Sequence, residues 1–71
     1  MNKETKKILK FIEETPQWFE KLKAIRAKNS NYKDFFNQIG YLLMELLNTE
    51  KNFFDYPREK IEISKIANLY F

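Results

Sequence analysis

The sequence lacks the residues on which most catalytic and metal sites depend. Its 71 residues include no cysteine and no histidine, so neither a disulfide nor a zinc site with these ligands can stabilise the fold. The same absence removes the usual general base and the thiol nucleophile of enzymes. We therefore expect a protein that is not an enzyme, binds no cofactor or metal ion and has no small-molecule substrate.

Glycine and long apolar runs are also scarce. The one glycine, Gly40, falls within a helical pattern, so no glycine-rich loop is available to hold a phosphate group. The longest apolar run covers residues 41–44, far short of the ~20 residues that cross a membrane. The N-terminus also lacks the apolar run of a signal peptide. These features predict a cytoplasmic protein without a membrane span.

What the sequence has instead is helical periodicity, which is clearest over residues 32–48. On a helix, eight large apolar side chains of this stretch fall within an arc of roughly 140°. They are Tyr32, Phe35, Phe36, Ile39, Leu42, Leu43, Leu46 and Leu47. An arc this wide can contact two neighbouring helices, so the stretch is predicted to be the central helix of the fold.

Three shorter amphipathic helices are expected around it, at residues 2–14, at residues 16–28 and from residue 57 toward residue 71. The pattern of residues 49–63 is ambiguous and leaves helix, loop and short strand open. Short connections favour antiparallel neighbours. The sequence therefore predicts one all-α domain over residues 1–71, a small bundle of about four helices packed around residues 32–48.

Positive charge is concentrated in the first two expected helices. Residues 1–28 carry eight basic and four acidic side chains, and the net charge of the whole chain is +3. Lysines on the outer sides of these helices could contact phosphates without reading sequence, in a salt-dependent way, or could simply be a solvated face. The candidate nucleic-acid contacts are Lys3, Lys6, Lys7, Lys10, Lys21 and Lys28.

Aromatic residues are unusually abundant, with seven Phe, four Tyr and one Trp. Phe53, Phe54 and Tyr56 lie in the ambiguous connection, where three rings are hard to bury at once. Exposed aromatic side chains are typical anchors at protein interfaces, so these three residues are the candidate partner-binding site, with core packing as the alternative.

The combined pattern favours a small non-enzymatic interaction protein that binds a macromolecular partner and modulates it, most simply by inhibition. Small immunity, anti-defence and regulatory-inhibitor proteins of bacteria and phages have this size and composition, an analogy at the level of fold alone. We expect a protein partner. A nucleic-acid-binding accessory protein is the alternative, and homo-oligomerisation is a third.

Overall fold

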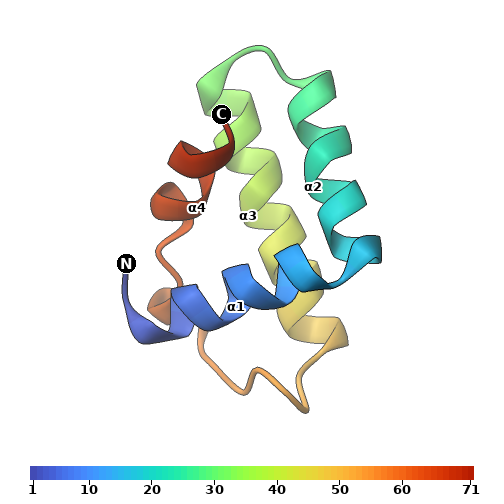
Figure 1. Ribbon diagram of the computed structural model, residues 1–71. Coiled ribbons are helices and arrows are strands. Elements are labelled where there is room, and N and C mark those ends of the chain that lie inside the picture. Colours follow the sequence, from blue (N-terminus) through green and yellow to red (C-terminus); the bar gives the residue numbers. More distant parts are fainter.

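In the computed structural model, which describes all residues from 1 to 71, the chain forms four α-helices and one short 3-10 helix (Figure 1). The elements are α1 (Lys3–Glu14), α2 (Pro16–Lys28), α3 (Tyr32–Thr49), η1 (Arg58–Lys60) and α4 (Ile63–Tyr70). No residue is in a β-strand. The predicted all-α bundle is confirmed, and the strand considered for residues 49–63 is excluded.

Local sequence signals explain where the first three helices begin. The side chain of Asn2 accepts a hydrogen bond of 2.8 Å from the backbone N–H of Thr5 at the start of α1. Pro16 occupies the first position of α2. A backbone N–H at this position would have no acceptor within the helix, so the absence of one in proline costs no hydrogen bond. The Asn31 side chain accepts from the N–H of Asp34 at 3.2 Å and caps α3.

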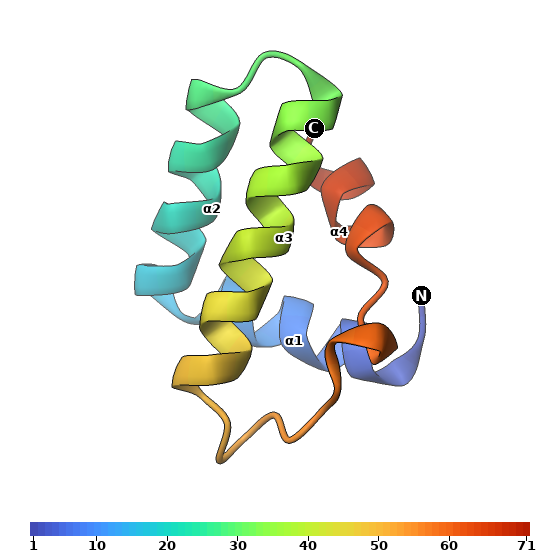
Figure 2. The ribbon, with the colours of Figure 1, turned by 180° about the vertical axis from the view of Figure 1, so that it is seen from behind.

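The helices are arranged around α3. Seen from behind, α3 lies in front, with α2 on one side, α4 on the other and α1 crossing at the back (Figure 2). One long face of α3 is therefore covered by no other helix. The loop between α2 and α3 is short, which makes these two helices an antiparallel pair (Figure 1).

The core contains 13 buried apolar residues drawn from every α-helix. The central helix supplies the largest share, namely Phe35, Ile39, Leu42, Leu43 and Leu46. Its predicted apolar arc is thus largely buried, although Tyr32, at the first turn of α3, is exposed. The role of α3 as the organising helix follows from this share of the core.

The connection after α3 differs from the sequence-based expectation. A helix was expected from residue 57, but residues 58–60 form only η1, and α4 begins at Ile63. Ile61 lies between η1 and α4 and is buried in the core. Leu69, near the end of α4, is 60% exposed.

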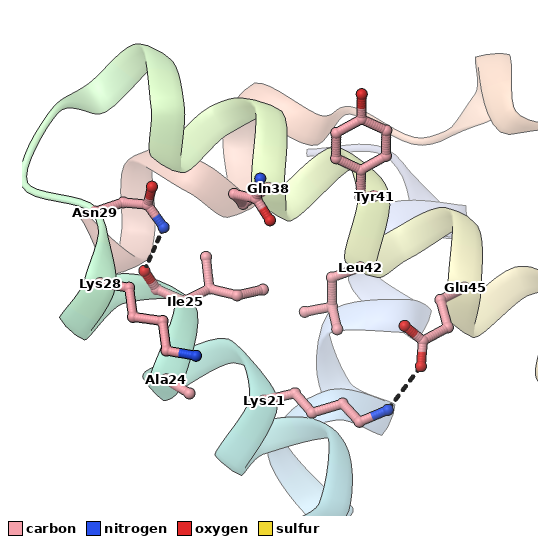
Figure 3. Close-up of a pocket in the computed structure, with 9 residues that line it drawn as sticks. All are labelled: Lys21, Ala24, Ile25, Lys28, Asn29, Gln38, Tyr41, Leu42 and Glu45. Atoms are coloured by element: carbon pink, nitrogen blue, oxygen red, sulfur yellow. Dashed lines mark hydrogen bonds and ion pairs between the residues drawn. The ribbon is translucent and has the colours of Figure 1, made fainter.

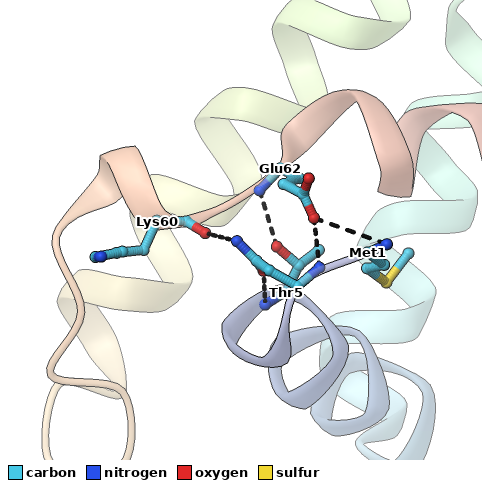
Figure 4. A network of polar contacts seen from close by, with 5 residues as sticks. Met1, Thr5, Lys60 and Glu62 are labelled. Atoms are coloured by element: carbon cyan, nitrogen blue, oxygen red, sulfur yellow. Dashed lines mark hydrogen bonds and ion pairs between the residues drawn. The ribbon is translucent and has the colours of Figure 1, made fainter.

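A polar network ties this connection to the N-terminus (Figure 4). The Glu62 N–H donates to the buried hydroxyl of Thr5 at 2.8 Å, and the Asn2 side-chain amide donates to the carbonyl of Lys60 at 2.7 Å. The backbone N–H of Asn2 donates to the Glu62 carboxylate, which also lies 4.0 Å from the α-amino group of Met1. Residues 60–62 are therefore fixed in place without belonging to an α-helix.

Candidate functional site

The turn that follows α3 places two adjacent phenylalanines in opposite environments, one exposed and one buried. The backbone N–H groups of Phe53 and Phe54 both donate to the carbonyl of Glu50, at 2.9 and 3.0 Å. Phe54 is only 4% exposed and belongs to the core, whereas Phe53 is 68% exposed. Tyr56 is half-buried. Of the three candidate anchors, Phe53 is thus available to a partner, Tyr56 is partly available, and Phe54 is not.

Ring contacts hold this turn against α1. Phe54 packs edge-on against Phe11 with ring centroids 5.1 Å apart, and its ring lies 5.9 Å from that of Tyr56. The ring of Phe53 stacks on that of Phe11, with the ring centroids 6.4 Å apart and an interplanar angle of 29°. The burial of Phe54 and the hydrogen bonds of the turn hold the backbone in place, and the side chain of the neighbouring Phe53 is exposed to solvent.

A cleft of about 240 Å³ lies between α1 and this turn. We call it the Phe53 patch, and its lining consists of Lys7, Lys10, Phe11, Glu14, Phe53 and Phe54. The patch brings together parts of two separate sequence-based predictions, the aromatic connection and the lysine-rich first helix. Phe11 was not among the predicted site residues, because helical periodicity does not show which residues of another segment a side chain contacts.

The lysines of α1 have no ion-pair partners. The three ion pairs of the protein join Met1 to Glu62, Lys21 to Glu45, and Lys23 to Glu20. The exposed, unpaired side chains along α1 are those of Lys3, Lys6, Lys7 and Lys10. Helix α1 also carries Glu4, Glu13 and Glu14, so its surface has a small excess of positive charge, which favours a negatively charged ligand.

The other two candidate lysines lie elsewhere. Lys21 and Lys28 line a groove of about 320 Å³ between α2 and α3 (Figure 3). The Lys21 ammonium is 2.6 Å from the Glu45 carboxylate, so its charge is already compensated. Ile25 and Leu42 supply the apolar lining between the helices, and no residue of α1 reaches this groove. The six predicted lysines therefore do not form one surface.

A third feature is the uncovered face of α3. Tyr41 is 66% exposed and stands between the α2–α3 groove and a second groove of about 320 Å³ toward α4, which Met44 and Arg58 help to line. Tyr41 is not among the eight residues of the predicted apolar arc, and its exposure agrees with a position outside that arc. This face carries no cluster of unpaired charge.

The phenol of Tyr70 has a clearly altered proton affinity. Burial raises the pKa of Tyr70 to about 12, and the hydrogen bond that its hydroxyl donates to Glu13, with the negative charge of that carboxylate, acts in the same direction. Its phenol stays protonated at neutral pH and links α4 to α1. The protein has no group of three or more acidic side chains placed to hold a metal ion.

Comparison with protein-family models, with curated proteins and with solved structures gave no match. None of the four α-helices combines the length and the apolar character that crossing a membrane requires.

Proposed function

We propose that the protein is a cytoplasmic, non-enzymatic interaction module that binds a protein partner through the Phe53 patch and inhibits it by occupying the bound surface. The observation that carries this proposal is the opposite burial of two adjacent residues, Phe53 at 68% exposed and Phe54 at 4%. This role is of the regulatory-inhibitor kind to which the immunity and anti-defence proteins of bacteria and phages also belong.

The fixed geometry of Phe53 supports an anchoring role. An interface side chain contributes most when it is large, apolar and already held in its bound position, because little conformational freedom is then lost on binding. Phe53 meets these conditions, since the turn at Glu50 and the buried ring of Phe54 fix its backbone. A single exposed apolar residue is ordinary on a protein surface, but Phe53 belongs to a cleft.

The proposal is tested by affinity capture from the native host with three forms of the protein. The wild type and a Tyr41→Ser variant should retain the same partner, and a Phe53→Ser variant should lose it. Tyr41 is the matched control because it is equally exposed, at 66% against 68%, and lies on α3 away from the patch. Equal recovery of the partner by all three forms would exclude Phe53 as the anchor.

A nucleic-acid accessory role is the second candidate, supported by the unpaired lysines of α1 beside an exposed aromatic ring. Lysines would contact phosphates while Phe53 stacks on a base. In this case the affinity for a single-stranded oligonucleotide should fall steeply with salt concentration, and Lys7→Gln should reduce the slope. No binding at low salt would remove this candidate.

A further inference from the structure

We propose that the segment recognised by the Phe53 patch is an acidic stretch of protein that carries one large apolar side chain between its carboxylates. This inference rests on the proposed function and specifies the chemistry of the partner. It follows from the size, the lining and the charge of the cleft.

The size of the cleft fits a side chain better than a free small molecule. Its volume of about 240 Å³ is below the ~300–1,000 Å³ of typical small-molecule sites. The rings of Phe11, Phe53 and Phe54 supply the apolar part of its lining. An apolar side chain placed there would contact Phe53 and Phe11, whose rings are 6.4 Å apart.

The positive charge around the cleft favours a bound segment with acidic residues on either side of its apolar side chain. Lys7 and Lys10 border the rings, and Lys3 and Lys6 continue the row along α1. None of the four has an ion-pair partner within the protein, so carboxylates of a bound segment would meet free ammonium groups. Complementary charge at the rim of an interface mainly accelerates association and disfavours wrong partners.

Glu14 favours a peptide over a nucleic acid as the occupant. Its side chain lines the same cleft, and Glu13 is exposed on the same helix. A nucleic-acid strand carries a charge at every phosphate and cannot omit the one that meets Glu14, whereas a peptide can place a neutral residue there. The patch also contains lysine alone, and arginine is the residue better suited to bidentate phosphate contacts.

The inference can be tested by titrating the ¹⁵N-labelled full-length protein with synthetic probes and following its amide NMR signals. The first probe is a capped peptide with one leucine between two pairs of glutamates. In the second the leucine is replaced by serine, in the third the glutamates are replaced by lysines, and the fourth probe is oligothymidylate. We expect the first peptide to shift the signals of Lys7, Lys10 and Phe53, and the other peptides to shift them little.

Protein variants locate the contacts in the same experiment. Phe53→Ser should weaken binding of the first peptide by about tenfold or more, as loss of an interface anchor does. The double variant Lys7→Gln/Lys10→Gln should weaken it about threefold, in line with exposed ion pairs, and should remove most of its salt dependence. The matched control Lys33→Gln/Lys65→Gln makes the same change in net charge at exposed lysines outside the patch and should bind normally.

Three results would overturn the inference. These are an absence of shifts with the first peptide, shifts confined to the α2–α3 groove, and tighter binding of oligothymidylate than of the peptide. Each is distinguishable from a failure of the proposed function, because host partner capture that is lost with Phe53→Ser would still identify Phe53 as the anchor. The amide spectrum of every variant shows directly whether it is folded.

Discussion

The central helix and the C-terminal part of the chain are held in the fold by different forces. Helix α3 is an uninterrupted helix from Tyr32 to Thr49 that supplies five core residues. Residues 50–71 contain a turn, η1 and the eight-residue α4, and they contribute only Phe54, Ile61, Ile66 and Ala67 to the core.

Polar contacts supplement the smaller core share of residues 50–71. They join Lys60 to Asn2, Glu62 to Thr5, Asn68 to Tyr32, Tyr70 to Glu13 and Phe71 to Arg26. The short, partly irregular segment is thus held in a defined position mainly by specific hydrogen bonds, whereas the long helix is held by its buried apolar surface. Stability should therefore respond differently to substitutions in the two regions.

The largest effect is expected from Phe35→Ala in the central helix. Phe35 is fully buried, so its truncation leaves a cavity among rigid neighbours and should lower the free energy of unfolding by ~4–5 kcal/mol. For a domain of this size, whose total stability is ~4–10 kcal/mol, that loss can abolish folding. Urea denaturation measures it, and Phe35→Leu, with an expected loss of ~1–2 kcal/mol, serves as the milder variant.

Phe54→Ala should destabilise less than Phe35→Ala, by ~2–3 kcal/mol, because the irregular segment around Phe54 can partly close the cavity. Phe53→Ala should change stability by no more than ~0.5 kcal/mol, as exposed residues generally do. Thermal unfolding of the three variants side by side checks this order. Equal losses for Phe53→Ala and Phe54→Ala would contradict the separation of the two rings.

Thr5→Val tests the polar attachment of the C-terminal part. Valine keeps the shape of threonine but leaves the Glu62 N–H without its 2.8 Å acceptor, which should destabilise the protein by ~1–2 kcal/mol. Hydrogen exchange of the Glu62 amide should accelerate more than that of amides in the middle of α3. The control is Thr49→Val, at the exposed end of α3, which should leave the Glu62 amide unchanged.

In contrast to the substitutions above, Gly40→Ala should stabilise the protein. Gly40 lies within α3 at a negative φ, and a Cβ added there would meet only the Cδ1 atom of Ile63, at an ordinary distance of 3.9 Å. Alanine has the higher helix propensity, so the free energy of unfolding should rise by ~0.5–1 kcal/mol. A lower melting temperature would show that α3 and α4 pack more tightly than the structure describes.

Tyr70→Phe should change the free energy of unfolding least, and the size of the change should depend on pH. The pKa of Tyr70 is about 12 in the folded protein and 10.0 ordinarily. The stabilising contribution of its phenol is therefore complete below pH 10 and is lost as the pH rises through 12. Denaturation at pH 8 and at pH 11 should show the advantage of the wild type over Tyr70→Phe shrinking, and a constant difference would contradict the raised pKa.

The first three helices were predictable from the sequence because their signals are local, whereas the start of α4 was predicted six residues too early. The second helix was expected at residues 16–28, which agrees with α2 at Pro16–Lys28. The central helix extends one residue beyond the predicted 32–48, to Thr49. Periodicity also identified the buried side of α3, since every residue of a regular helix has its direction set by its position.

The candidate site was predictable only in part, because the connection between α3 and α4 has no regular spacing of apolar residues from which burial could be predicted. Phe53 and Phe54 are identical in type and adjacent, and only the turn at Glu50 decides which ring is buried. The contact between Phe53 and Phe11 joins segments 42 residues apart in the sequence. Side-chain type alone specifies neither feature, so candidate residues of the patch could be predicted but their arrangement could not.

The hydrogen bonds between the N-terminus and residues 60–62 limit the order in which contacts can form in the nascent chain. The ribosome makes α1 first, yet the partners of Asn2 and Thr5 follow 57 to 60 positions later. Helices α2 and α3 can pair through their short loop during translation, because contacts close in sequence form early. Helix α1 can also pack against α2 early, but its first turn can be fixed by hydrogen bonds only after residue 62 has been synthesised.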